Sequence, residues 1–175
     1  MEKKYTKLSV FDFDGTLIET PTEDYGKTIY FEKTGVEWPH KGWWSKPETL
    51  DPRYFKFPVI DSVIADYRKE KSNPDTMVIM LTGRIPKLAP MVEDILKSHN
   101  LSFDGYYYNT GGGTDVSKIR TLNEILEQNP EIRAVELWDD RLSHIPIFEA
   151  WGKKRSEEGR LDDFSVNVIY SGRHD

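Results

Sequence analysis

The chain has no cysteine among its 175 residues. This absence excludes disulfide bonds, thiolate nucleophiles and zinc sites built from thiolates. A metal ion would therefore have to be bound by oxygen atoms or by imidazole nitrogen. The sequence also lacks any apolar run near the roughly 20 residues that a membrane-spanning helix needs. We therefore expect no membrane span.

No secretory leader is recognisable at the N-terminus, because positions 2–4 are charged and the apolar stretch that follows is interrupted by Asp12 and Asp14. We therefore expect a cytoplasmic protein. An excess of positive charge is lacking too, since 24 Lys and Arg residues face 30 Asp and Glu residues, for a net charge of −6. This balance argues against a protein that coats nucleic acid through a broad basic surface, although it leaves room for a local basic pocket.

The length and the composition are typical of one soluble globular domain, with 37% hydrophobic and 31% charged residues. We therefore expect a single domain over residues 1–175. Residues from about 19 to 58 show poor periodicity and are dense in aromatic residues and prolines. This stretch predicts a small, irregular, cap-like insertion after the first strand, partly folded onto the core.

Short apolar runs predict five strands, and stretches with apolar residues at helical spacing predict helices between them. The predicted strands are 7–13, 77–81, 105–108, 134–138 and 165–170, and the predicted helices are 59–71, 86–100, 117–127 and 142–151. Strands that alternate with helices predict an α/β fold with a doubly wound, five-stranded parallel sheet of the Rossmann-like kind. Ligands of such sheets bind beyond the carboxyl ends of the strands.

Polar side chains follow four of these predicted strands, and two aspartates at one strand end can simply mark a turn. Turn preference does not explain why several strand ends deliver such groups to one edge of one sheet. Converging carboxylates repel one another unless a cation holds them, and an all-oxygen site with few ligands suits Mg²⁺. We therefore predict a magnesium site. The residues after the strands are Asp12 and Asp14, Thr82 and Arg84, Asn109, and Asp139 and Asp140.

The segment Asp12-Phe13-Asp14-Gly15-Thr16, followed in order by Thr82, Lys118 and Asp139-Asp140, resembles the four-motif pattern of the haloacid dehalogenase (HAD) superfamily. Four segments resemble more narrowly the phosphatase-like family called Swiss Army Knife RNA repair-like, and polynucleotide-end phosphatase domains. The resemblance spans about residues 7–151. The four segments are Gly42-Trp43-Trp44 with Pro47, Thr82-Gly83-Arg84, Phe103-Asp104-Gly105, and Asp139-Asp140-Arg141 with His144.

This resemblance implies a Mg²⁺-dependent phosphatase in which Asp12 attacks phosphorus to form an aspartyl-phosphate. Asp14 would protonate the leaving oxygen and then activate water. Thr82 would donate a hydrogen bond to the phosphoryl oxygens, and Lys118 would offset negative charge, unless it is an ordinary solvated lysine. The implied metal ligands are Asp12, Asp14, Asp139 and Asp140, with Asp139 favoured over Asp140 as the direct ligand.

For substrate binding, the resemblance points to Gly83, Arg84 and Arg141, whose arginines would hold a second phosphate. Ion pairs with the aspartates are the alternative for both arginines. Two tryptophans of the insertion, Trp43 and Trp44, either anchor an irregular loop to the core or stack on a base. A contact with substrate and a capping or surface role both stay open for His144.

The implied partner is a phosphorylated substrate, either a nucleotide or a nucleic-acid end. The acidic net charge of −6 favours the alternative of a small-metabolite phosphatase. A third alternative, from a different class, is a non-catalytic module that binds phosphorylated ends.

Overall fold

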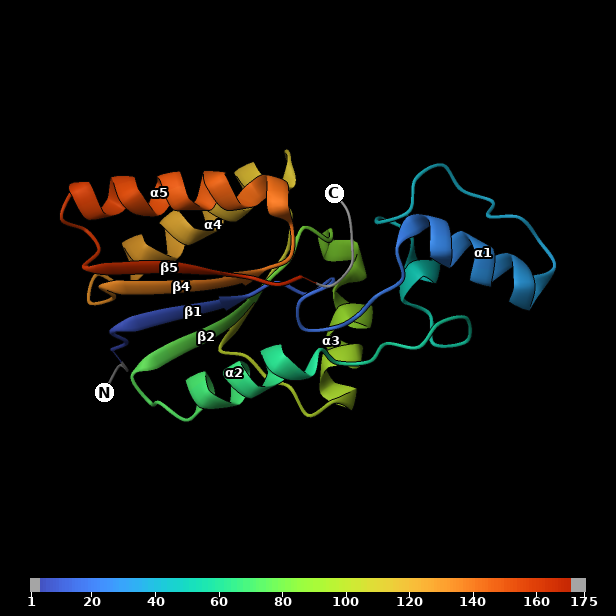
Figure 1. Cartoon of the computed structure of the whole chain (residues 1–175), viewed down its shortest axis with the longest axis horizontal. Helices are drawn as coiled ribbons and strands as arrows, with labels where there is room; N and C mark the ends of the chain where they lie inside the picture. The colour runs from blue at the N-terminus through green and yellow to red at the C-terminus, as the bar shows by residue number, and fades with distance from the viewer. Residues whose placement is uncertain (1–3, 171–175) are drawn as a thin grey trace.

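The computed structural model describes residues 4–170. Its centre is a five-stranded parallel sheet in the order β3-β2-β1-β4-β5 (Figure 1). This confirms the predicted α/β fold, and the ends of the observed strands differ from the predicted ends by no more than two residues. The strands are β1 (Lys7–Phe11), β2 (Thr76–Leu81), β3 (Gly105–Tyr107), β4 (Ala134–Asp139) and β5 (Asp163–Val168).

Four helices cover the two faces of the sheet (Figure 1). Helices α2 (Asp61–Lys71) and α3 (Ala89–Ser98) pack on one face, and α4 (Thr114–Gln128) and α5 (Ile145–Glu157) pack on the other. Successive residues of a strand point to opposite faces, so β1 contributes to both cores. Three short 3₁₀ turns complete the core: η1 (Pro47–Leu50), η2 (Pro86–Leu88) and η3 (Leu142–His144).

The insertion was predicted to be irregular, and this prediction was wrong for one stretch, because residues Glu23–Thr34 form helix α1. Only Gly26 and Tyr30 of this helix are buried, so no apolar stripe repeats at helical spacing. The available signals were acidic residues in its first turn and Gly35, whose φ of 72° ends the helix in the left-handed conformation. Figure 1 shows α1 beyond the carboxyl ends of the strands.

The insertion has a small hydrophobic core of its own, centred on Tyr30, Trp43 and Phe55. The ring of Trp43 lies against Gly26 so closely that a Cβ on Gly26 would be 2.1 Å from it. A glycine is therefore required at this point of α1 by the close approach of the ring. The insertion thus packs around its own aromatic residues, separately from the two cores of the sheet.

One motif residue of the resemblance has a structural role. The carboxylate of Asp104 accepts a hydrogen bond from the backbone N–H of Val78 at 2.8 Å, and the N–H of Asp104 donates to the carbonyl of Val78 at 2.7 Å. These two bonds join the start of β3 to β2. The Phe103-Asp104-Gly105 segment therefore aligns the edge strand of the sheet.

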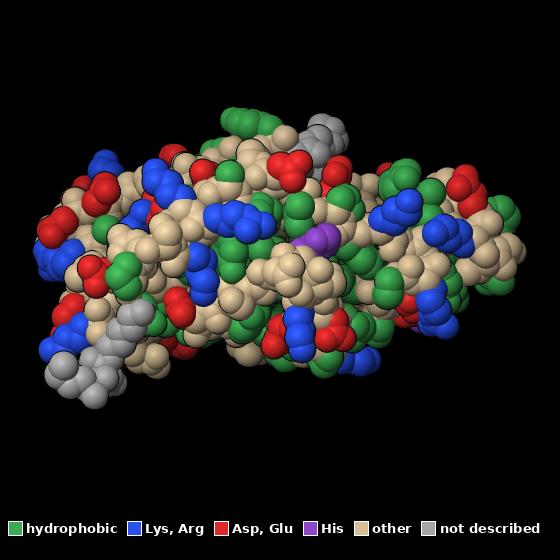
Figure 2. All heavy atoms as spheres, turned by 90° about the horizontal axis from the view of Figure 1, so that it is seen from below, with side chains coloured by type: hydrophobic (Ala, Val, Ile, Leu, Met, Phe, Trp, Pro, Cys, Tyr) green, Lys and Arg blue, Asp and Glu red, His purple; other side chains and the backbone are tan. Residues whose placement is uncertain are grey.

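Within residues 4–170, no helix combines the length and the apolar character needed to cross a membrane. Figure 2 shows acidic and basic side chains interspersed over the face of the molecule that it presents. On this face of the described chain, positive charge does not gather into one broad patch, in line with the acidic composition.

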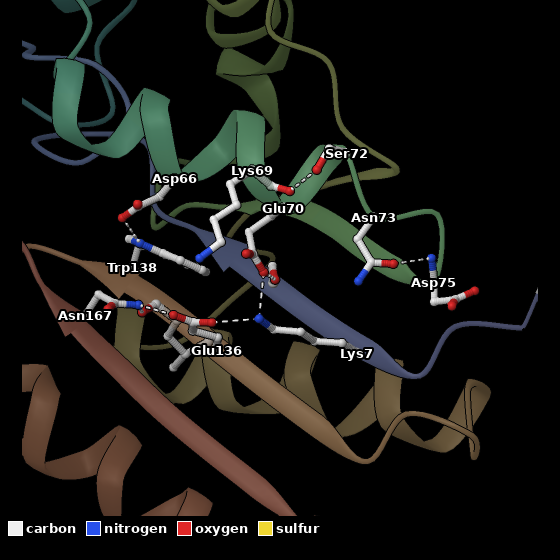
Figure 3. Close-up of polar contacts among 12 residues, drawn as sticks. Lys7, Asp66, Lys69, Glu70, Ser72, Asn73, Asp75, Glu136, Trp138 and Asn167 are labelled. Carbon is white, nitrogen blue, oxygen red and sulfur yellow. Dashed lines mark hydrogen bonds and ion pairs between the residues drawn. The ribbon is translucent and has the colours of Figure 1, made fainter.

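A polar network lies between α2 and the sheet (Figure 3). The ammonium group of Lys7 lies 2.7 Å from a carboxylate oxygen of Glu70 and 2.7 Å from one of Glu136. Glu70 also accepts a hydrogen bond of 2.6 Å from the hydroxyl of Ser9, which is fully buried. The amide of Asn167 donates to Glu136 at 2.8 Å. The network therefore ties α2 to β1, β4 and β5.

The position of Glu70 in this network makes part of the stability depend on pH. Burial raises the pKa of Glu70, but the hydrogen bonds from Lys7 and Ser9 outweigh burial and lower the pKa below its usual value. A carboxylate with a lowered pKa stabilises the fold above its unfolded pKa of about 4.3, and this contribution is lost as pH falls through the folded pKa.

We expect Glu70→Gln to lower the free energy of unfolding by about 1 kcal/mol at neutral pH, because a charge-assisted partner of Lys7 and Ser9 is lost. The difference from the wild type should shrink as pH falls below about 4. Urea unfolding at several pH values measures both. Glu127→Gln, which alters an exposed residue of α4, is the matched control. A difference between Glu70→Gln and wild type that does not vary with pH would contradict this explanation.

Candidate active site

The first motif lies on a tight turn directly after β1. The backbone N–H of Asp12 still donates to the carbonyl of Trp138 at 3.0 Å, so Asp12 continues the sheet by one residue. Gly15 then adopts a φ of 70°, a left-handed conformation that glycine takes without strain. Its N–H donates to the carbonyl of Ile18 at 2.8 Å. The turn leaves Asp12 and Asp14 at the rim of the sheet.

The order of the strands reverses between β1 and β4, where ligands of doubly wound sheets bind. Strand β1 pairs in parallel with β4, so Asp12 comes next to Asp139 at this point. Carboxylate oxygens of Asp12, Asp139 and Asp140 all lie within 4.8 Å of one another. Opposite ligands of an octahedral Mg²⁺ ion are about 4.2 Å apart. The three carboxylates are therefore close to the spacing that such an ion needs.

Lys118 reaches this cluster from α4. Its ammonium nitrogen lies 3.1 Å from Oδ1 of Asp12 and 2.8 Å from Oδ2 of Asp139, and the residue is 3% exposed. Burial alone would lower the pKa of Lys118, but the two carboxylates more than offset burial and raise it. Lys118 is therefore the buried, charged partner of two aspartates and not a solvated lysine.

The pKa of Asp12 is raised well above its usual range, chiefly by burial. Lys118 acts in the opposite direction, while Asp139, Asp140 and Asp14 raise the pKa further through charge repulsion. One ammonium group is therefore not enough to stabilise the ionised form of Asp12. A hard divalent cation held by carboxylate oxygens would supply the additional positive charge. The donor set thus fits Mg²⁺.

The second motif places a threonine and a glycine between the end of β2 and the start of α4. Thr82 is 1% exposed, and its hydroxyl oxygen accepts the backbone N–H of Arg84 at 3.1 Å, so the hydroxyl proton can be donated elsewhere. A Cβ on Gly83 would lie 2.6 Å from Cγ2 of Thr114. Gly83 therefore lets the first turn of α4 approach closely, and Lys118 lies one turn further along that helix.

Arg84 forms an ion pair with Asp14, as one of the two alternatives for this arginine predicts. Its Nε and Nη2 donate to the two carboxylate oxygens at 3.0 and 2.7 Å. Nη1 donates to the carbonyl of Trp44 at 2.8 Å and to the hydroxyl of Thr49 at 2.7 Å. The hydroxyl of Thr20 also donates to Asp14 at 2.6 Å. The insertion therefore holds the Arg84 and Asp14 pair in place.

Sequence reasoning did not identify Thr20 and Thr49 as members of the site. Both are almost completely buried, at 2% and 0% exposure, and both belong to the insertion. Neither lies in a recognisable motif, and isolated threonines are common in turns and loops. Only the folded path of the insertion brings their hydroxyl groups to the ion pair.

The remaining candidate residues differ in exposure. Trp43 is 1% exposed, so it offers no face to a substrate and acts as the anchor of the insertion. Trp44 is 43% exposed, and its ring centroid lies 5.1 Å from Cζ of Arg84. The side chain of Arg141 is exposed, while its N–H donates to Asp139 at 2.9 Å. His144 is buried, and within the described chain its Nδ1 has no hydrogen-bond partner.

A family model described as HAD domain family 1 in Swiss Army Knife RNA repair proteins matches residues 26–174. The matched region begins after the first motif and includes the second, third and fourth. An uncharacterized protein of Saccharomyces cerevisiae is 28% identical over 175 residues, which cover 86% of this chain and 38% of that protein. The chain thus spans well under half the length of this curated relative.

Three solved structures resemble the chain in fold. One chain of a Pnkp1/Rnl/Hen1 complex matches with a TM-score of 0.59 at 19% identity, over 95% of this chain and 48% of that one. A haloacid dehalogenase-like hydrolase of Streptococcus pneumoniae matches with a TM-score of 0.51 at 14% identity, over 92% and 93%. The HAD domain of effector protein Lem4 of Legionella pneumophila matches with 0.52 at 11% identity, over 98% and 89%. These likenesses establish a HAD-type core.

We expect Gly83→Ala to destabilise the protein by about 1–3 kcal/mol, because the new methyl group would overlap the side chain of Thr114. Thermal unfolding measures the loss. The double variant Gly83→Ala with Thr114→Ala removes the atoms nearest to the new methyl group and should recover most of the stability. A double variant as unstable as Gly83→Ala alone would show that close packing is not what requires this glycine.

Addition of Mg²⁺ should raise the thermal unfolding temperature, because an ion that binds only the folded state stabilises it by mass action. Asp140→Asn should weaken this increase, since it removes one carboxylate of the cluster. Asp24→Asn changes an exposed aspartate of α1 and should leave the increase unchanged. An equal Mg²⁺ effect in all three proteins would place the ion elsewhere.

Proposed function

Since this chain belongs to HAD domain family 1 of the Swiss Army Knife RNA repair proteins, we propose that it is a Mg²⁺-dependent phosphomonoester hydrolase that forms an aspartyl-phosphate intermediate. The observation that carries this proposal is the convergence of Asp12, Lys118 and Asp139 at the point where the strand order reverses. We also propose that residues 1–175 form one domain, with residues 19–58 as a small cap.

The nucleophile of the proposed reaction is Asp12. Lys118, 3.1 Å away, orients its carboxylate and favours the ionised form that can attack phosphorus. The bond formed joins a carboxylate oxygen to phosphorus, and the bond from phosphorus to the leaving oxygen breaks. Mg²⁺, when bound, would supply positive charge to the phosphoryl oxygens and reduce their repulsion from the carboxylates. Its ligands would be Asp12, Asp139, Asp140 and the main-chain carbonyl of Asp14.

Asp14 is the proposed group for proton transfer. Paired with Arg84 and Thr20, its carboxylate is oriented to accept a proton from the water that hydrolyses the intermediate. To protonate the leaving oxygen in the first step, Asp14 must carry the proton and loosen one bond to Arg84. The insertion holds Arg84 through Trp44 and Thr49, so the position of the insertion controls this step.

The other residues of the site would bind the transferred group. The buried hydroxyl of Thr82 can donate to a phosphoryl oxygen, and Lys118 can offset its charge. The backbone of Gly83 lies between Thr82 and Arg84 and would contact the same oxygens. The side chain of Arg141 is exposed beside Asp140 and could reach a second phosphate of a longer substrate.

A phosphorylated nucleic-acid end or a nucleotide is the proposed substrate class. The description of the matching family refers to RNA repair proteins, which supports this choice. The net charge of −6 and the mixed charges seen in Figure 2 favour a small phosphorylated metabolite as the second candidate. A salt titration separates the two, because a polymeric substrate loses affinity steeply as salt rises.

Purified protein with Mg²⁺ should release phosphate from phosphomonoesters, and Asp12→Asn should lower the rate by about 10³-fold or more, because the covalent route is lost. Asp14→Asn should lower the rate by about 10²–10⁴-fold through loss of proton transfer. A colorimetric phosphate assay measures both, with Asp24→Asn as the matched control. A chelator should abolish the activity of the wild type.

Undiminished phosphate release by Asp12→Asn would remove the proposed mechanism. The alternative of a non-catalytic module predicts that the wild type binds phosphorylated ends but releases no phosphate. Beryllium trifluoride distinguishes the two further, because it should occupy Asp12 only where an acylphosphate can form.

A further inference from the structure

Two consecutive tryptophans of the insertion point in opposite directions. Trp43 is 1% exposed and packs with Tyr30 and Phe55 in the small core of the insertion. Trp44 is 43% exposed, although it is a large apolar side chain. The other four tryptophans of the chain are buried or half-buried. Trp44 is therefore the exposed indole of the molecule, and its position needs an explanation.

Arg84 holds Trp44 in two ways. Its Nη1 donates to the carbonyl of Trp44 at 2.8 Å, and its Cζ lies 5.1 Å from the centroid of the indole ring. Arg84 is 3% exposed, so the guanidinium covers the inner face of the ring and the outer face meets solvent. A ring held by its backbone and by a cation–π contact loses little further freedom when a planar group stacks on it.

The same guanidinium holds Asp14 through two hydrogen bonds of 3.0 and 2.7 Å. Asp14 is the proposed acid for the leaving oxygen, so the leaving group must lie beside it. Trp44 and Asp14 occupy different edges of one planar group, which places the indole on the side of the leaving group. A nucleoside attached to the phosphate carries its base about one sugar ring away from the leaving oxygen.

We propose that the outer face of Trp44 is a stacking platform for the base of the leaving nucleoside. This inference rests on the proposed phosphatase function, because it uses the role of Asp14 to locate the leaving group. It commits the site to substrates with a nucleobase next to the phosphomonoester, and it makes Trp44 a residue that determines specificity.

A second aromatic surface of the insertion provides the matched control. Tyr25 is 61% exposed and lines a hollow of about 650 Å³ between α1 and residues 54–58, together with Lys33 and Lys56. None of the printed contacts of Arg84 involves this hollow. Tyr25→Ala therefore removes an exposed aromatic ring of the same insertion without touching the ion pair.

The test is a calorimetric titration in the Asp12→Asn background with Mg²⁺, in which ligands bind without turnover. The ligands are adenosine 3′-monophosphate, adenosine 5′-monophosphate, a phosphorylated oligonucleotide, and glycerol phosphate, which has no base. Trp44→Ala should weaken the base-bearing ligands by about 5- to 100-fold, the range that loss of one stacked base produces. Trp44→Phe should retain most of the affinity, and glycerol phosphate should bind all variants equally.

Several outcomes would overturn the platform. Equal weakening of glycerol phosphate and nucleotides by Trp44→Ala would mean that the variant only disturbs Arg84, and weakening by Tyr25→Ala alone would place the base in the other hollow. Urea unfolding checks that Trp44→Ala folds, and Trp44→Phe tests the platform if it does not. Nucleotide binding that depends on Trp44 without any turnover by the wild type would refute the phosphatase and keep the platform. Turnover of every ligand without an effect of Trp44→Ala would do the reverse.

Discussion

Repulsion between buried carboxylates is the constraint on which the rest of the site depends. Strand β1 pairs with β4, and this brings Asp12 and Asp139 to the same point of the rim, where they share the ammonium group of Lys118. Burial and neighbouring aspartates raise the pKa of Asp12 in spite of that lysine. Such an arrangement is unfavourable without a function, because buried like charges lower stability. It is explained by a divalent cation and by a nucleophile that must be held close to it.

The close packing around this cluster follows from the same constraint. Lys118 can reach both aspartates only if the first turn of α4 lies directly against the end of β2. The glycine at position 83 allows this contact, because any larger residue would meet Thr114. A residue that resembles part of a substrate-binding motif therefore also has a packing role. Positioning and chemistry are combined in one short segment.

A second ion pair connects the insertion to the chemistry. Arg84 uses all three of its nitrogen atoms, two on Asp14 and one on oxygen atoms of the insertion. A buried ion pair of this kind adds little net stability, but it fixes geometry, because breaking it would leave a charge buried without a partner. The path of the insertion therefore sets the position of Asp14, and the exposed ring of Trp44 is fixed by the same guanidinium.

The amino-acid sequence by itself determined the order of strands and helices, since short apolar runs and helical spacing are local patterns, and its motifs indicated the HAD superfamily. It did not reveal α1, whose burial is too slight to leave a periodic pattern. Nor could it decide between an ion pair and a phosphate contact for Arg84, or tell Trp43 from Trp44. Those distinctions depend on which side of an irregular segment faces the core, and the spacing of residues does not encode that direction. Only the packing of distant segments against one another decides it.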